Sequence, residues 1–461
     1  MRSWLQAFRP AAVIVFALVA TMSAQQAPRL PNRGTVVLYE NARLIPGDGQ
    51  PAIERAALLV RDGRIARVGR AAEIGLPQGA ARVDLAGKTI LPTLINVHTH
   101  TGFQKGATYT RENYGREGIL DDLNRALYFG ITAVVSQGID PGDTALRIRA
   151  EQAAGALGGA RLFIAGRGIG FPNAGPGADT YRGIAYSLTT PEEGRKAVRE
   201  QAALKVDLIK IWVDDRNGRA PRMTPDVSHA IIDEAHKHGL KVNAHVFYLS
   251  DVTDLTNAGI DGFAHLARDK ELDDATVQAI VKRGVVMMTT LGTPERTTHT
   301  NVPQTLAAWL DGPVRDGAPQ AMIDRVKAGF MGRDEATAAA NRERYAILQR
   351  TVAKLAKAGA KIALGSDTGI QDHPFGITDH RELELLVEAG MTPMQVLTAA
   401  TSASAAYLKL NDQGVLAAGK RANFLVLDAN PLDAITNTRR IASVYVNGAE
   451  VDRAALASRL H

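Results

Sequence analysis

Between residues 92 and about 400, short apolar runs alternate with longer stretches of helical periodicity. Each apolar run has the length of a buried strand, and apolar residues recur every three or four positions between the runs. Strands that alternate with helices are typical of a parallel sheet, and eight of them indicate a (β/α)8 TIM barrel. The eight predicted strands are residues 94–100, 131–138, 161–168, 207–213, 241–246, 261–266, 285–291 and 361–367.

Helix-start signals support this α/β fold class. Thr190-Pro191, Thr224-Pro225 and Thr392-Pro393 each place a capping hydroxyl before a proline in the first turn. The connection spanning residues 292–360 is too long for a plain loop. It contains helical patterns near 303–311, 318–331 and 334–358, which we interpret as a lid or capping insert whose role the sequence does not define.

A different pattern flanks the barrel on both sides. Residues 35–91 and 411–461 show short alternating strands, with turns at Asp62-Gly63 and Asn447-Gly448 that are typical of tight hairpins. We expect the two segments to form one small β-sandwich, so that the barrel, residues 92–410, is inserted in a discontinuous β domain.

The N-terminus has the layout of a secretory signal peptide. Arg2 and Arg9 precede an apolar run over 11–22, and small residues follow at Ser23 and Ala24. We expect a signal peptide over 1–24, a flexible leader over 25–34, and a periplasmic or secreted enzyme; an uncleaved anchor is the alternative. No other segment approaches the length of a membrane span, so no membrane association is expected after signal removal.

The amino-acid composition excludes several kinds of metal site and binding partner. The 461 residues contain no cysteine, which excludes disulfides and thiolate metal sites. The net charge of +6 comes from basic residues scattered among acids, so nucleic-acid binding is not expected. We expect a small-molecule substrate, and a homo-oligomer stays open because no motif encodes assembly.

Ionisable residues recur at the predicted strand ends, where TIM barrels carry their chemistry. His98 and His100 close strand one, and alternation along a strand places both imidazoles on the same face. All such positions would converge at one end of the barrel, and imidazole and carboxylate groups together are typical metal ligands. The candidate metal ligands are His98, His100, Lys210, His245, His265 and Asp367.

Lys210 is unusual in this set because a protonated lysine repels divalent cations. Its place in the apolar run "DLIKIWV" would lower its pKa by burial. A neutral lysine can react with CO₂ to give a carbamate, an anion whose two oxygens can bridge two metals.

The motifs "ILPTLINVHTH", "DLIKIWV", "NAHV", "GIDGFAHL" and "ALGSDTG" resemble the amidohydrolase superfamily, close to the imidazolonepropionase-like and metal-dependent prolidase-like amidohydrolases. The tail "GVLAAGKRANFLVLDANPLDAI" is similar too, and the resemblance covers residues 35–448. Where the family commonly has Gly and Asp, this chain has Thr93 and Asn96, and where the family tail has Asp it has Asn423. None of the three is a ligand in the family pattern.

The resemblance implies two divalent metal ions, with zinc expected. His98 and His100 would hold the more buried ion with Asp367, His245 and His265 would hold the second, and carbamylated Lys210 would bridge them. A hydroxide between the metals would be the nucleophile, with Asp367 as general base and then acid. The expected reaction is cleavage of an amide or peptide bond in a dipeptide or N-acyl amino acid.

Three alternatives stay open. A lactonase or phosphotriesterase-like esterase would use the same binuclear site. A mononuclear deaminase is disfavoured, because Tyr248 stands where such enzymes have Glu and because they lack the bridging lysine. A non-catalytic binding protein would be expected to lose ligands. Substrate-binding candidates are Arg167, Tyr248 and His299, of which Arg167 or His299 could bind a substrate carboxylate.

Overall fold

The computed structural model describes residues 36–458 apart from 177–178, 217 and 311–318. The predicted signal peptide and leader, residues 1–34, therefore lie outside the described residues. Among the described residues, no helix combines the length and the apolar character that crossing a membrane requires.

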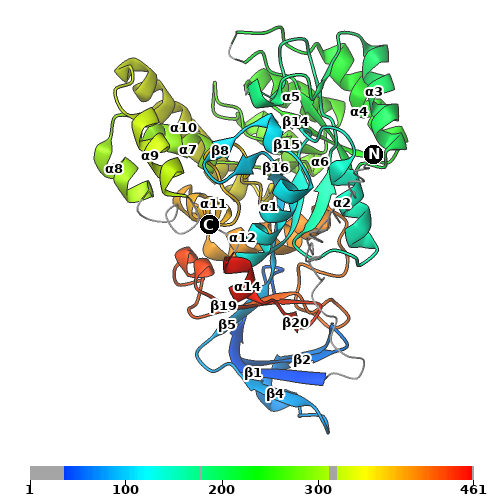
Figure 1. Ribbon diagram of the computed structural model, residues 1–461, viewed down its shortest axis with the longest axis vertical. Helices are drawn as coiled ribbons and strands as arrows, with labels where there is room; N and C mark the ends of the chain where they lie inside the picture. The colour runs from blue at the N-terminus through cyan, green and yellow to red at the C-terminus, as the bar shows by residue number, and fades with distance from the viewer. Residues whose placement is uncertain (1–35, 177–178, 217, 311–318, 459–461) are drawn as a thin grey trace, which may run out of the picture.

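Eight parallel strands form the predicted barrel, and the chain is a TIM barrel with an additional β domain (Figure 1). Two parallel sheets, β10-β9-β6 and β13-β14-β15-β16-β17, meet at two seams. At one seam Val97 N donates to Leu364 O at 2.8 Å, and at the other Asp207 N donates to Ile164 O at 2.8 Å. The strands are β6 (Leu94–Thr99), β9 (Ile131–Ser136), β10 (Arg161–Ile164), β13 (Leu208–Trp212), β14 (Lys241–His245), β15 (Gly262–Ala264), β16 (Val286–Met288) and β17 (Lys361–Ala363).

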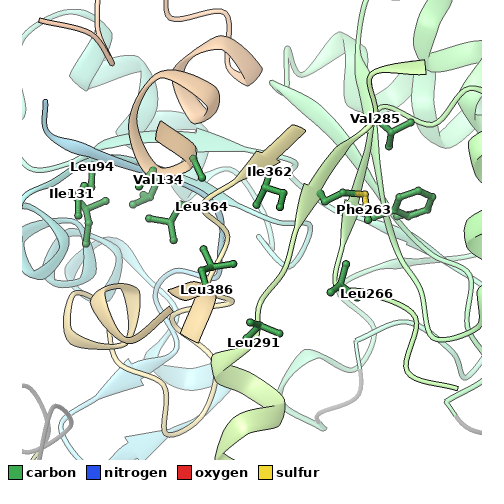
Figure 2. Packing of buried hydrophobic residues seen from close by; sticks show 14 of the residues in the cluster. Leu94, Ile131, Val134, Phe263, Leu266, Val285, Leu291, Ile362, Leu364 and Leu386 are labelled. Atoms are coloured by element: carbon green, nitrogen blue, oxygen red, sulfur yellow. The ribbon is translucent and has the colours of Figure 1, made fainter. Parts of the chain in front are cut away.

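Helices connect the strands and cover the outside of the barrel. Their apolar faces and the strands share one continuous core, to which Val134, Phe263 and Leu386 belong (Figure 2). The predicted cap at Thr190 is confirmed, because its hydroxyl accepts from Glu193 N at 3.3 Å. The connecting helices are α1 (Arg116–Tyr128), α2 (Thr144–Ala153), α3 (Pro191–Ala203), α4 (Pro225–Lys237), α5 (Leu249–Ala258), α6 (Asp274–Arg283), α11 (Ile377–Glu388), α12 (Pro393–Thr398) and α13 (Ser404–Tyr407).

The long connection between β16 and β17 is helical, as predicted. It contains α8 (Pro303–Trp309), α9 (Gln320–Phe330) and α10 (Glu335–Lys357), and an additional short helix, α7 (Gly292–Thr298), that the sequence pattern did not indicate. Helices α8 and α9 form a projection on one side of the barrel (Figure 1) and contribute to a small core of their own. Its function as a lid stays a prediction.

Short strands also extend from the barrel. β7 (Gln104–Lys105) and β8 (Thr108–Tyr109) form a hairpin after β6, while β11 (Ile169–Gly170) pairs with β13 and with β12 (Tyr186–Ser187).

Strands from both ends of the chain form one eight-stranded sheet, in the order β20-β19-β18-β5-β1-β2-β3 with β4 on β1. Tyr39 on β1 lies 5.2 Å, ring to ring, from Tyr445 on β19, although three strand spacings of about 4.8 Å would separate these strands in a flat sheet. The sheet therefore curls around an apolar core. Its strands are β1 (Val36–Leu44), β2 (Ile53–Arg61), β3 (Arg64–Arg70), β4 (Ala81–Asp84), β5 (Thr89–Pro92), β18 (Phe424–Leu427), β19 (Ile441–Val446) and β20 (Ala449–Glu450), with α14 (Arg453–Ala457) following.

Candidate metal centre

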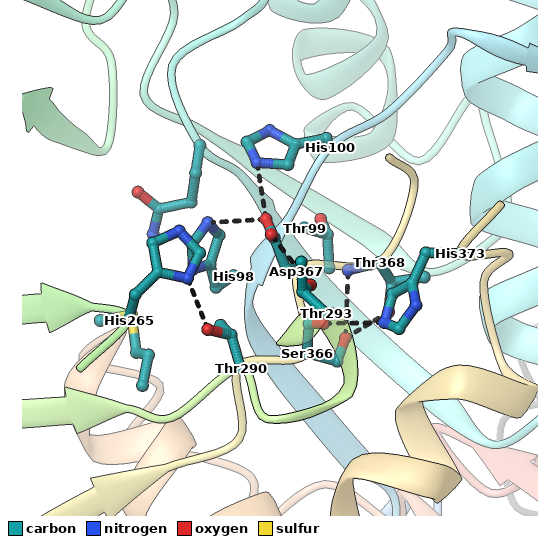
Figure 3. A network of polar contacts seen from close by, with 12 residues as sticks. His98, Thr99, His100, His265, Thr290, Thr293, Ser366, Asp367, Thr368 and His373 are labelled. Carbon is teal, nitrogen blue, oxygen red and sulfur yellow. Dashed lines mark hydrogen bonds and ion pairs between the residues drawn. The ribbon is translucent and has the colours of Figure 1, made fainter. Parts of the chain in front are cut away.

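Three predicted ligands meet at the carboxyl end of the barrel. His100 Nε2 lies 3.0 Å and His98 Nε2 lies 3.3 Å from Asp367 Oδ1 (Figure 3). One ligand atom from each of the three residues lies within 4.8 Å of the others, and all three residues are buried. This spacing suits a single metal ion.

Backbone bonds hold the end of β6 against the loop after β17. Asp367 N donates to His98 O at 3.0 Å, and His100 N donates to Thr368 O at 2.7 Å. Gly369 has φ +92, and a Cβ there would lie 1.6 Å from His100 O. Only glycine permits so close a backbone approach, so this turn brings Asp367 to the histidine pair.

His265 and His245 extend the cluster on the neighbouring strands. Their rings lie 4.5 Å apart, and the His265 ring lies 5.0 Å from that of His98, measured between centroids. His265 Nδ1 lies 2.5 Å from Thr290 Oγ1, which leaves Nε2 for a ligand. Four histidines are therefore contiguous.

The backbone is strained at several of these positions. His265, Thr290 and Asp367 have φ of 82°, 49° and 61°, in the left-handed region that non-glycine residues rarely adopt. Such conformations persist only where the surrounding structure enforces them, and they cluster at functional sites.

Lys210 is buried at the centre of β13 with 1% of its surface exposed, and its Nζ has no hydrogen-bond partner. Burial lowers its pKa from 10.5 to about 7, against the opposing attraction of Asp367 and Asp214. A substantial fraction of this lysine is therefore uncharged near neutral pH.

Electrostatics favour the ligand forms of the other residues. Burial lowers the pKa values of His98 and His265 well below the usual range, so both rings are neutral. Burial acts in the opposite direction on the Asp367 carboxyl, but the hydrogen bond from His100 opposes it, and the pKa of Asp367 lies well below normal. Neutral imidazoles beside a carboxylate are the protonation states that a metal requires.

Buried nitrogen atoms without hydrogen-bond partners also indicate that these residues hold a metal. Both ring nitrogens of His98, like Lys210 Nζ, are buried without a hydrogen-bond partner. Leaving such groups unpaired costs about 1–3 kcal/mol each. Nitrogen and oxygen ligands without thiolate suit zinc and similar divalent ions.

Two charged residues beside the site were not found from the sequence. Asp214 Oδ2, just after β13, lies 3.7 Å from His245 Nε2. Burial lowers the pKa of the Arg268 guanidinium, and the carboxylates of Asp214 and Asp367 oppose that lowering. Asp214 could have been proposed from "WVDD", since it follows the strand directly, whereas Arg268 follows His265 by three residues without any distinctive signal.

The predicted substrate-binding residues lie in different surroundings. Tyr248 is near the site. Its hydroxyl donates to Asp215 Oδ1 at 2.8 Å, and desolvation, together with the Asp215 carboxylate, raises the pKa of Tyr248 to about 12. Arg167 instead donates to Ile184 O at 2.7 Å and stacks on the Tyr186 ring. His299 lies in the insert, 3.6 Å from Glu295 Oε1. No contact that the structure describes joins Arg167 or His299 to the metal-ligand candidates, because each is engaged elsewhere.

The sequence matches the amidohydrolase family over residues 89–451, which contain the whole barrel and all six candidate ligands. The chain belongs to the amidohydrolase family. It is therefore a hydrolase of the amidohydrolase type, as the resemblance implied.

Among its relatives is ochratoxinase from Aspergillus niger, 26% identical over 474 residues that cover 90% of this chain and 86% of that protein. Phenylurea hydrolase B is similar in structure with a TM-score of 0.73 and 25% identity, covering 92% of this chain and 98% of the other. A Xaa-Pro dipeptidase with bound methionine shares the fold at a TM-score of 0.72 and 23% identity, covering 90% of this chain and all of the other.

Proposed function

We propose that this amidohydrolase holds two divalent metal ions bridged by a carbamate on Lys210 and cleaves an amide or peptide bond in a small substrate. The observation that carries the proposal is the Lys210 amine, buried and unpartnered in a cluster with neutral histidines and Asp367. A permanently charged lysine there would repel a metal, whereas a carbamate would attract two.

Carbamate formation needs only the uncharged amine and CO₂. The lone pair of Nζ forms a bond to the carbon of CO₂, and a proton leaves the nitrogen for solvent. A cationic side chain thereby becomes an anion with two oxygen donors. The lowered pKa of Lys210 favours this reaction, because only the neutral amine is nucleophilic.

The other residues then have separate roles. His98 and His100 with Asp367 would hold one ion, and His245 with His265 the second. Bound metals lower the pKa of water toward neutrality and polarise a substrate carbonyl. The Asp367 carboxylate would accept the proton of the attacking water and deliver it to the leaving amine.

The proposed substrates are small amides such as dipeptides and N-acyl amino acids. Support comes from the family and from relatives named for ochratoxin, for phenylureas and for Xaa-Pro dipeptides. A bound substrate carboxylate would find a half-buried cation in Arg268, which lies in the field of Asp214 and Asp367.

Metal analysis of the purified protein tests the site. We expect about two metal ions per chain in the wild type, and loss of at least one in Lys210→Ala. Lys361→Ala is the matched control, because Lys361 begins β17 at the opposite end of the barrel. One ion per chain that is unchanged in Lys210→Ala would refute the bridge and favour the mononuclear deaminase.

A substrate panel tests the bond that is cleaved. N-acyl amino acids, Xaa-Pro dipeptides, lactones and phosphotriesters would be compared with the same metal-loaded preparation. Hydrolysis of the amides supports the proposal, and activity only toward lactones or phosphotriesters would replace it with the esterase alternative.

We also propose that the enzyme is exported, on the evidence of its first 24 residues. N-terminal sequencing of the protein recovered from a periplasmic or culture fraction of a bacterial host would test this, and a chain retained in the cytoplasm with an intact N-terminus would refute it.

A further inference from the structure

A buried carboxylate behind the metal centre collects four hydrogen bonds. Asp379 Oδ1 accepts from Ser366 Oγ at 2.7 Å, from Thr368 Oγ1 at 2.8 Å and, at short range, from Asn96 Nδ2. Its Oδ2 accepts from Gly376 N at 2.7 Å at the start of α11. Asp379 thereby joins β6, the loop after β17 and α11.

Three of the four bond partners, Ser366, Thr368 and Asn96, lie one or two residues from a candidate metal ligand. Ser366 and Thr368 flank Asp367 on both sides. Asn96 is on β6, and its Oδ1 accepts from the backbone N of His98 at 2.9 Å. No contact that the structure describes joins Asp379 directly to Asp367 or His98. Asp379 therefore acts on the site only through the residues that it bonds.

The hydrogen bonds of Asp379 matter because the backbone at Asp367 is strained. Asp367 has φ +61, a conformation that the surrounding contacts must enforce. The residues before and after it are both tied to the same carboxylate oxygen. Without those bonds the loop could relax and move the Asp367 carboxylate away from His98 and His100.

We infer that Asp379 is a positioning residue that acts through the Asn96 amide to hold His98 and Asp367 at metal-binding separation. The directions of the hydrogen bonds require an amide at position 96 and a carboxylate at position 379. Asn96 must donate through Nδ2 and accept through Oδ1, and Asp379 must accept at both oxygens. The inference rests on the proposed metal centre but concerns residues that no ligand role includes.

Two isosteric variants break this polarity without changing the packed volume. Asn96→Asp brings two carboxyl groups into direct contact. Asp379→Asn places an amide NH₂ against either the Asn96 amide or the Gly376 N–H, so that two donors face each other whichever way it is flipped. The double variant Asn96→Asp/Asp379→Asn reverses the pair: the new amide donates to the new carboxylate, and the hydroxyls of Ser366 and Thr368 can rotate to match.

The experiment measures metal affinity by competition with a chelator, together with the visible spectrum of the cobalt-substituted protein. Each single variant is expected to lose about tenfold in metal affinity, the low end of the effect of changing a residue bonded to a ligand side chain, because Asp379 and Asn96 act one step further away. The double variant should recover most of that affinity and restore the wild-type cobalt spectrum. The cobalt spectrum distinguishes positioning from a general loss of stability, because it reports the ligand geometry of the protein that remains folded.

Asn423→Asp is the matched control, because Asn423 is another buried asparagine, bonded to Gln413 and, through its backbone, to Thr93 before β6, at the other end of that strand from the ligands. It should retain wild-type affinity and spectrum. This inference would be overturned if the single variants bind metal as the wild type does, or if the double variant binds metal no more tightly than the single variants. The proposed function would not be affected by either result. A wild type that binds no metal would overturn the proposed function and this inference with it.

Discussion

His100 Nε2 lies 3.0 Å from Asp367 Oδ1, which joins the first strand of the barrel to the last. The same oxygen lies 3.3 Å from His98 Nε2, while Thr293 Oγ1 donates to the other oxygen at 3.1 Å. One carboxylate oxygen thus faces the histidines, and the second is held by a hydroxyl. This division leaves one oxygen for a metal and fixes the direction of the other.

Replacing this carboxylate with an amide should remove its base and ligand functions while preserving its shape. We expect Asp367→Asn to lower the hydrolysis rate by about 10²- to 10⁴-fold, the usual contribution of a general acid–base group. Initial rates on the best amide substrate, with circular dichroism to verify folding, would measure this. Near-wild-type turnover in a folded variant would show that another residue transfers the proton.

Metal removal should affect stability as well as activity. Dialysis against a chelator would leave the buried nitrogens of His98 and Lys210 unpaired, and a ligand that binds only the folded state stabilises it by mass action. We therefore expect a lower thermal unfolding midpoint and loss of hydrolysis, both recovered on adding zinc. Chelator already saturated with zinc is the control, and an unchanged midpoint after metal removal would argue against a metal at this site.

A glycine beside Lys210 offers a steric test. A Cβ on Gly138 would lie 2.8 Å from both Cβ and Cγ of Lys210, whereas a Cβ on Gly142 would meet nothing within 4 Å. Both glycines have positive φ, so alanine costs backbone strain of about 1–2 kcal/mol at either position. We expect Gly138→Ala alone to displace Lys210 and to reduce metal content and activity at least tenfold. Equal effects of the two substitutions would show that backbone strain, and not the position of Lys210, is responsible.

The barrel was predictable because buried parallel strands are continuous apolar runs. The strand read as 207–213 is observed as Leu208–Trp212. Strands near the site end earlier than the apolar runs do: the runs 261–266 and 361–367 end as strands at Ala264 and Ala363. The residues that follow include His265 and Asp367, whose left-handed backbone cannot continue a ladder, and nothing in an apolar pattern encodes that turn.

The six candidate ligands could be proposed from the sequence because each lies in or just after an apolar strand, whereas the residues that support them could not. Asp379 lies in the first turn of α11, in "ITDHRE", and resembles an ordinary helix-capping acid. Its bond to Asn96 joins residues that are distant in sequence and follows no spacing rule. Arg167 and His299 lie at or after the ends of predicted strands and could bind a substrate carboxylate, but each contacts a neighbour in its own segment instead.

A buried carboxyl group in α1 should make stability depend on pH. Asp122 lies in α1 and accepts from Gly102 N at 2.7 Å, and burial raises its pKa from 3.8 to about 7. Between about pH 4 and 7 the folded protein keeps a proton that the unfolded chain has lost, so this residue's contribution to stability is present below pH 4 and is lost as the pH rises to 7.

Asp122→Asn removes that dependence and keeps an acceptor for Gly102. At pH 8 we expect the variant to be more stable than the wild type by about 2 kcal/mol, since each pKa unit corresponds to about 1.4 kcal/mol and relaxation absorbs part of a three-unit shift. At pH 4 the difference should vanish. Unfolding midpoints across this range would measure it, with Asp121→Asn, an exposed neighbour on the same helix, as the charge-matched control. A wild type and an Asp122→Asn variant that differ equally at pH 4 and pH 8 would show that Asp122 is ionised throughout, with Gly102 N and Arg125 compensating its burial.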